Sequence, residues 1–161
     1  ESEPGKGSQI IIKLPLTIAI IQALMVEVER SIFAIPLSTV IEAVRISRSE
    51  IKTINGREVL HLRDRVLPLI RLAQEFDIPT DSNRERFYVV VAALGDRRVG
   101  VVVDELRSQE EVVIKSIWDY LETVKGVSGA TITGEGKVVL ILDTSELVQN
   151  AQAWHNPGIA A

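Results

Sequence analysis

A glycine-rich run near the start of the chain is the first candidate for chemistry. Gly5-Lys6-Gly7-Ser8 brings together glycines, a lysine and a hydroxyl group, the residue types with which loops hold phosphates. A nucleotide-binding phosphate loop needs four residues between its glycines and a helix directly after them. Here one residue separates the glycines, and no helical pattern follows. We therefore interpret the run as a linker and predict no nucleotide site in it.

The histidines are the next candidates, as bases or as acceptors of a phosphoryl group. Such a role needs an exposed ring nitrogen and a carboxylate that orients the ring. His61 lies between Leu60 and Leu62 in a strand-like segment, with no pattern of acids or bases around it. We predict a histidine on the surface of a strand. His155 lies in a tail, residues 151–161, that we predict to be flexible.

Two pairs of carboxylates, Asp104-Glu105 and Glu110-Glu111, could serve a metal ion or acid–base chemistry. The chain has no cysteine and one histidine within its folded pattern, so the ligand set for a metal is poor. We predict no catalytic residue, no metal and no cofactor. The acidic pairs are interpreted as a solvated face or as an acidic rim that faces a partner.

Trp118 and Tyr120 stand close together in a predicted short helix over residues 116–121. Two residues apart, they do not share a face of that helix. Both types often anchor protein interfaces, and a role in the core is an equally good interpretation.

Composition narrows the class of protein. The 161 residues are 46% hydrophobic and 25% charged, which is typical of one ordinary globular domain or two small ones. The net charge of −4 leaves no basic surplus, so nucleic acid is not an expected partner. The apolar stretch over residues 14–28 is interrupted and falls short of the roughly 20 residues that span a bilayer, so we expect no membrane insertion. The start lacks a signal peptide and an initiator methionine, and we expect a piece of a longer protein.

Short segments rich in β-branched residues dominate the chain. Alternation over residues 24–29 and the runs at 31–36, 59–62, 66–70, 87–94, 99–103, 111–115, 130–133 and 137–142 predict strands, several of them joined by hairpin turns. Asp64 is assigned the left-handed turn position between two of these strands. Pro68 predicts an edge or bulged strand. Short helices are predicted at 72–76 and from Thr144, the latter with a capping box of Asp143 and Glu146.

The pattern repeats once along the chain. Residues 29–35 align with 96–102, and residues 66–71 align with 138–143, in the same order of strand, turn, strand, charged segment, hairpin and short helix. The repeat predicts a mainly β fold of two five-stranded barrels, which would each be marginal alone and should therefore share a core. We place the lobes at about residues 17–84 and 85–150.

Three segments carry a resemblance to a known family. Residues 100–106 with 109–116, residues 126–132 with 134–136 and 140–143, and the hairpin over 62–72 resemble the regulatory CheW-like domain of CheA-type chemotaxis histidine kinases. Asp64 stands where the family often has glycine. Residues 1–16, with the segment 10–17, are similar to the end of the ATP-binding domain that precedes this domain in such kinases.

The resemblance implies two SH3-like barrels, between which terminal segments can cross, and a regulatory scaffold that is not itself an enzyme, although the parent chain would be a protein-histidine kinase. It implies a cytoplasmic domain in membrane receptor arrays that binds a CheW-type adaptor and the tips of chemoreceptors. We expect a monomer, with weak self-association through barrel ends left open. The alternative is a stand-alone CheW-type adaptor, and an enzyme or ligand-binding barrel is a third reading that no constellation of residues supports.

Docking residues are sought among apolar side chains that recur at corresponding places in the two lobes. The candidates are Ile46, Ile51, Ile54, Val112, Val113 and Ile114. For each of them, an ordinary inward-facing position on a strand is the competing interpretation.

Overall fold

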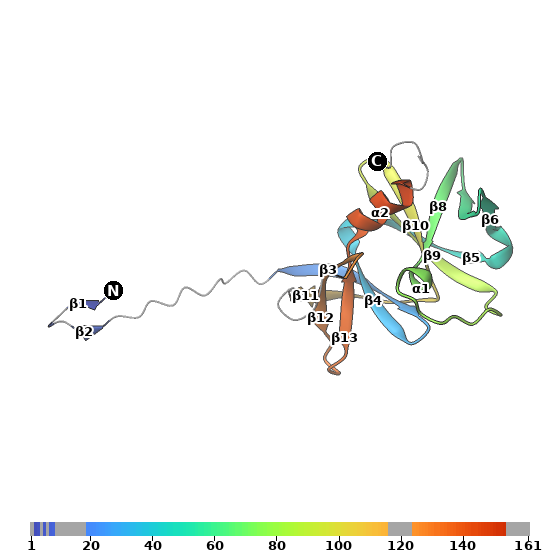
Figure 1. Ribbon diagram of the computed structural model, residues 1–161. Coiled ribbons are helices and arrows are strands. Elements are labelled where there is room, and N and C mark those ends of the chain that lie inside the picture. Colours follow the sequence, from blue (N-terminus) through green and yellow to red (C-terminus); the bar gives the residue numbers. More distant parts are fainter. Residues whose placement is uncertain (1, 4, 6, 9–18, 116–123, 154–161) are drawn as a thin grey trace.

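Two mixed β-sheets form the body of the molecule (Figure 1). The computed structural model describes residues 2–3, 5, 7–8, 19–115 and 124–153. The strands of the six-stranded sheet follow the order β5-β9-β10-β8-β7-β6, and those of the five-stranded sheet follow β11-β3-β4-β13-β12. The strands of the two sheets are β3 (Ile20–Val28), β4 (Ser31–Pro36), β5 (Val40–Ser47), β6 (Ile51–Ile54), β7 (Arg57–Leu62), β8 (Arg65–Arg71), β9 (Arg86–Leu94), β10 (Arg97–Val103), β11 (Glu105–Val113), β12 (Val127–Ile132) and β13 (Val138–Leu142).

Each sheet curls into one barrel, and each barrel takes strands from both halves of the chain. The first barrel contains β5 to β10, and the second contains β3, β4 and β11 to β13. The division into lobes at residues 17–84 and 85–150 is therefore corrected, because β3 and β4 pair with strands that follow residue 104. The two repeat copies exchange their first hairpins: β3 and β4 complete the barrel of the second copy, and β9 and β10 complete that of the first.

The strand orders of the two barrels match position by position. The first hairpin of each copy, β9–β10 or β3–β4, lies between an antiparallel partner and a parallel partner. The parallel partner is β8 in the first barrel and β13 in the second. Lys115 forms an isolated bridge with Ala130 of β12, which closes the second barrel. The first barrel has one strand more, because β6 pairs with β7 and follows β5 through the short 3-10 turn η2 (Arg48–Glu50).

Four apolar clusters follow from this arrangement in the described part of the chain. The largest lies between the barrels and takes side chains from both, two fill one barrel each, and a small one contains Val127 and Ala130 of β12. On β9, Val90 packs in the shared cluster and Val89 packs inside the first barrel. On β3, Val26 and Met25 divide in the same way between the shared cluster and the second barrel. Strands that are buried on both faces need continuous apolar runs, which explains the valine-rich sequence of β9.

The predicted shared core is therefore present, and two local predictions need correction. Pro68 lies on an interior strand, at the point where β8 stops pairing with β7 and begins to pair with β10. A residue without an N–H is accepted there because the ladder changes sides. In the β7–β8 turn it is Arg63, with φ of 55°, that adopts the left-handed conformation assigned to Asp64.

Two helices follow the last strands of the two copies. Helix α1 (Leu72–Glu75) is a single turn, as predicted, and α2 (Thr144–Ala153) packs Leu147 and Val148 into the shared cluster. Asp143 accepts the Glu146 N–H at 3.0 Å and so caps α2. The other half of the predicted capping box is wrong, because the Glu146 carboxylate accepts the N–H of Gly126 at 2.8 Å instead.

Near the start of the chain, β1 (Ser2–Glu3) and β2 (Gly7–Ser8) pair with each other as a short antiparallel hairpin. The predicted remnant strand at residues 10–17, the short helix with Trp118 and Tyr120, and His155 in the tail lie outside the described residues. Among the helices that the structure describes, none combines the length and the apolar character that a bilayer crossing requires.

Candidate docking ends and the junction between the barrels

The six predicted docking residues divide into three groups by exposure. Ile46 on β5 and Val112 on β11 occupy equivalent strands, and both are buried inside their own barrels. Strand pairing shows that the two residues are equivalent, because Ile46 pairs with Phe87 and Val112 pairs with Ile21 at the matching position. Both belong to the core, so neither exposes its side chain. Ile51 and Ile114 are half-buried against the same clusters.

Ile54 and Val113 remain as surface candidates, one on each barrel. The exposed fraction of Ile54 is 52%, and that of Val113 is 40%. Val113 pairs across the sheet with Ile20, which is 59% exposed, so two apolar side chains meet there on the surface. Figure 1 places β6, which carries Ile54, and β11, which carries Val113, on opposite sides of the molecule.

Other exposed apolar residues were not among the predicted docking residues. Ile132 and Val138 face each other across the ladder beside the β12–β13 turn, and Val66 lies beside the β7–β8 turn. A depression of about 450 Å³ between the starts of β4 and β13 includes Val138 together with Arg30 and Lys137. These residues belong to ladders predicted as strands, and nothing in an apolar–polar alternation distinguishes an exposed apolar face from a buried one.

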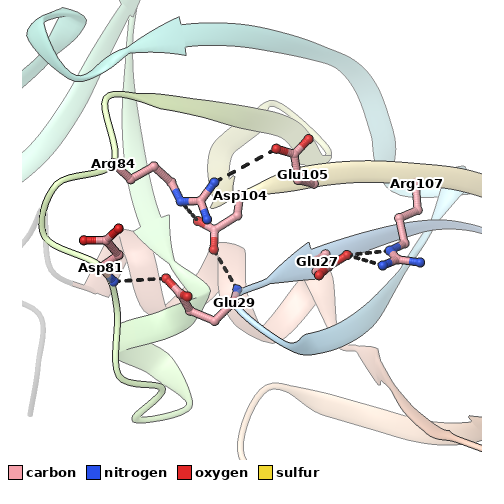
Figure 2. A network of polar contacts seen from close by, with 7 residues as sticks. All are labelled: Glu27, Glu29, Asp81, Arg84, Asp104, Glu105 and Arg107. Atoms are coloured by element: carbon pink, nitrogen blue, oxygen red, sulfur yellow. Dashed lines mark hydrogen bonds and ion pairs between the residues drawn. The ribbon is translucent and has the colours of Figure 1, made fainter.

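A polar network lies where the chain passes from the first barrel to the second, and Asp104 is at its centre (Figure 2). The Asp104 side chain accepts the backbone N–H of Glu29 at 2.6 Å, and its own N–H donates to the Glu27 carbonyl at 2.9 Å. The Arg84 guanidinium lies 3.4 Å from the Asp104 carboxylate and 4.0 Å from that of Glu105. Asp104 is only 8% exposed, so the predicted solvated face is wrong for this residue.

Further contacts extend the network on both sides. The Asp81 N–H donates to the Glu29 carboxylate at 3.0 Å, which joins the segment before β9 to the β3–β4 turn. Arg107 on β11 donates to the Glu27 carboxylate at 2.6 Å, which joins two neighbouring strands of the second barrel. Sequence reasoning missed Asp104 as a buried residue. The repeat gave no signal for it: the equivalent pairs Val28–Ser31 and Leu94–Arg97 show that the alignment of residues 29–35 with 96–102 is wrong by one residue, and Asp104 corresponds to Ser38.

A polar cavity of about 230 Å³ lies next to this network. Its lining includes Arg71, whose guanidinium forms two hydrogen bonds with Glu58 at 2.5 and 3.0 Å and stacks over the Phe87 ring. Arg84 and Asp104 line it as well, so its best-buried charges are already paired. We find no arrangement in this lining that would bind a substrate.

The remaining chemical candidates are surface features. His61 is exposed on β7, as predicted for a histidine on the surface of a strand, and Glu110 and Glu111 are exposed on β11. Across the described ranges, no three His, Asp or Glu side chains gather closely enough to hold a metal ion. Glu50 in η2 accepts the Ser47 N–H at 2.6 Å, and this hydrogen bond lowers the pKa of its carboxyl group.

Fold and surface together define a class: a pair of SH3-like barrels with exchanged hairpins and with exposed apolar residues on each barrel. The model of the CheW-like domain family matches residues 22–152. The chain is 48% identical over 155 residues to the sensor histidine kinase CheAY of Helicobacter pylori, with 95% of this chain and 19% of that protein covered. It is 42% identical over 149 residues to the chemotaxis protein CheA of Bacillus subtilis, with 92% and 22% covered. The crystal structure of the scaffolding protein TtCheW from Thermoanaerobacter tengcongensis superposes with a TM-score of 0.67 at 17% identity, over 78% of this chain and 90% of that one.

This chain belongs to the CheW-like domain family. It spans about a fifth of the length of the curated relatives named above, and the match falls in their CheW-like part, which is not catalytic. The family and its fold, two SH3-like barrels, confirm the resemblance drawn from the sequence.

Proposed function

We propose that this domain is a regulatory scaffold of a CheA-type kinase, which docks a CheW-type adaptor and the tips of chemoreceptors and so couples receptor signals to the kinase. The relatives named CheA, which align with more than nine-tenths of this chain, support the assignment to a chemotaxis complex. The observation that carries the docking role is the presence of exposed apolar residues on opposite sides of two equivalent barrels. In this proposal the domain works in the cytoplasm, within membrane receptor arrays.

We place the docking contacts at the barrel ends marked by Ile54 and by Val113 with Ile20. Large exposed apolar side chains that cluster on a surface commonly mark protein interfaces. Two ends that face away from each other suit a module that joins neighbours in an array. Ile51 and Ile114 would connect these ends to the barrel cores, because each is half-buried and packs against the core of its barrel.

A stand-alone adaptor is the second candidate, because the matched TtCheW structure is covered over 90% of its length by this fold. Both candidates dock partners through the same two barrels. They differ in the partner. As the regulatory domain of a kinase, this chain would bind the adaptor, and as an adaptor, it would bind the regulatory domain of the kinase.

Titration calorimetry with a purified CheW-type adaptor tests the proposal. We expect saturable binding with a dissociation constant in the micromolar range or below, as for other transient signalling contacts. Absence of heat and of a complex at several hundred micromolar would overturn the kinase-domain proposal. Binding to the matching regulatory domain of a CheA kinase, without binding to the adaptor, would favour the second candidate.

Two charged substitutions locate the docking ends. Ile54→Asp and Val113→Asp should each weaken adaptor binding at their own barrel by about tenfold or more, because a buried carboxylate in an apolar contact is strongly unfavourable. Val66→Asp and Ile132→Asp are the matched controls, since these residues are as exposed as Ile54 but lie beside the β7–β8 and β12–β13 turns. Weakening by the controls with none by the first pair would place the interface elsewhere.

A further inference from the structure

The chain crosses between the barrels at two points, and these two points differ chemically. The first crossing is the 3-10 turn η1 (Leu37–Thr39) between β4 and β5, where Leu37 packs against the shared cluster. The second is Asp104, between β10 and β11, where a buried carboxylate lies directly after the strand. One crossing is thus fixed by apolar contact and the other by directed polar contacts.

The segment over residues 77–85, which we call the linker, adds a non-covalent connection to the second crossing. It begins at α1 and ends at β9, so its covalent ends belong to the first barrel. The first barrel also holds it from one side, because Arg48 donates its backbone N–H to the Glu85 carbonyl at 2.9 Å and its guanidinium to the Ser82 carbonyl.

The second barrel holds the linker from the other side. The Asp81 N–H bonds to Glu29 in the β3–β4 turn at 3.0 Å, and Arg84 pairs with Asp104 at the crossing. Asp104 in turn accepts the Glu29 N–H, so linker, turn and crossing meet at one carboxylate. Figure 2 shows Glu29, Asp81, Arg84 and Asp104 meeting from three separate segments, with Asp81 taking part through its backbone N–H.

We propose that these four residues form a latch that sets the orientation of one barrel relative to the other, with Arg84 and Asp104 as its positioning residues. The shared apolar cluster holds the barrels together, but apolar burial is non-directional and tolerates small rotations. The hydrogen bonds from the Glu29 N–H to Asp104 and from the Asp81 N–H to the Glu29 carboxylate impose defined distances and angles. The Arg84–Asp104 ion pair adds an attraction between charges that are shielded from water. The latch therefore supplies the angular restraint that the cluster does not.

The latch has a consequence for docking, and this consequence rests on the proposed function. The exposed residues Ile54 and Val113 lie on different barrels, so the angle between barrels sets the direction from one docking end to the other. Loss of the latch should leave each end able to bind and should weaken structures in which both ends are occupied at defined angles.

Double electron–electron resonance, which measures the distance between two spin labels, tests the latch on the whole chain without any partner. The chain contains no cysteine, so Thr53→Cys and Glu135→Cys introduce one spin label on each barrel without background labelling. We expect one narrow distance distribution. Arg84→Met should broaden or shift it, and Arg84→Lys should restore it in part, because lysine keeps the charge but loses the planar fork.

Arg107→Met is the matched control. It also removes an arginine–carboxylate pair, but Arg107 and Glu27 lie on adjacent strands of the second barrel, so the distribution should stay narrow. Glu29→Gln is a second latch variant at a partly exposed position and should broaden the distribution less than Arg84→Met does.

Hydrogen exchange separates orientation from local order. Amides at residues 80–85 should exchange about tenfold faster in Arg84→Met, as expected for the loss of a charge-assisted contact. Faster exchange in the linker with an unchanged distance distribution would overturn the latch, because the contacts would then order the linker without orienting the barrels. A broadened distribution in a chain that fails to bind the adaptor would support the latch and contradict the proposed function.

Discussion

The two barrels share one strand order, yet the side chains at equivalent positions differ in type and make different contacts. The parallel contact between β8 and β10 in the first barrel includes Gly100, whereas the matching contact between β4 and β13 in the second is made by Phe33, Ala34, Leu140 and Ile141. At the end of β8, Arg71 pairs with Glu58 in the first barrel, and directly after β13, Asp143 caps α2 in the second. The comparison teaches that pairing geometry is conserved between the copies while side-chain chemistry is free to change.

The largest expected effect tests whether the barrels fold as one unit. Ile35 is fully buried in the shared cluster, and Ile35→Ala should lower the free energy of unfolding by about 2–5 kcal/mol. Leu60→Ala and Ile141→Ala, each within one barrel, should move the same transition. Urea unfolding followed by circular dichroism is the measurement. Two separated transitions in any of the three variants would show that the barrels unfold independently, against a common core.

The next effect addresses the glycine that distinguishes the first barrel. A Cβ at Gly100 would lie 2.6 Å from Leu69 Cδ2 and 2.7 Å from Val89 Cγ1, so the neighbouring strands leave it no room. Gly100→Val should lower the free energy of unfolding by about 1–3 kcal/mol through overpacking. Gly134→Val is the control, because nothing lies within 4 Å of a Cβ there. Equal effects of the two substitutions would contradict a close approach of neighbouring strands at Gly100.

A smaller effect compares Arg71, the last residue of β8, with Asp143, which directly follows β13. Asp143→Ala removes the cap of α2 and should lower the free energy of unfolding by about 1 kcal/mol. Arg71→Met removes the pair with Glu58 but keeps an apolar stem over Phe87, and a similar loss of about 1 kcal/mol is expected for this partly exposed pair. Thermal unfolding of the two variants is the check. If Asp143→Ala leaves the unfolding temperature unchanged, α2 depends on its packing and not on its cap.

The smallest effect concerns η2, the turn that precedes the additional strand β6 of the first barrel. The pKa of Glu50 is lowered by the Ser47 N–H and hydroxyl groups, so its ionised form is favoured in the folded state. Because the pKa of Glu50 is lower in the folded chain, its ionised carboxylate stabilises the fold at a pH above the unfolded-state pKa of 4.5. This stabilisation is lost as the pH falls through the folded-state pKa. Glu50→Gln should therefore reduce stability slightly at pH 7, and the difference from the unsubstituted chain should disappear on acidification below 4.5. A difference in stability between the two chains that persists or grows at low pH would contradict a lowered pKa for Glu50.

The sequence allowed much of the fold to be predicted, because strand signals are local. The valine-rich run of β9 and the hairpins around Asp96 and around residues 134–136 have short-range patterns that turn chemistry and β-branching explain. The sequence predicts only a charged segment where the structure has β5. Glu42 and Arg45 lie among the apolar residues of β5, because one face of this strand is exposed, and this mixture obscures the strand pattern.

The exchange of hairpins was beyond sequence reasoning, because it depends on which distant strands pair. A hairpin of the same pattern fits either barrel, and the choice is made by contacts between residues that lie far apart in the chain. The docking residues show the same limit: Ile46 and Ile54 are both isoleucines on short strands, but one fills a barrel and the other faces solvent. Asp104 was misread for the opposite reason, since a carboxylate after a strand usually meets water.

The most direct test of the account is the number of adaptor molecules that one chain binds. Sedimentation velocity of this chain with an excess of a CheW-type adaptor should reveal a complex of two adaptors per chain, one at each barrel end. Ile54→Asp and Val113→Asp should each reduce the complex to one adaptor, and the double variant should abolish it. A single site that neither substitution affects, or no complex at all, would contradict the claim that the two barrels serve as two docking ends.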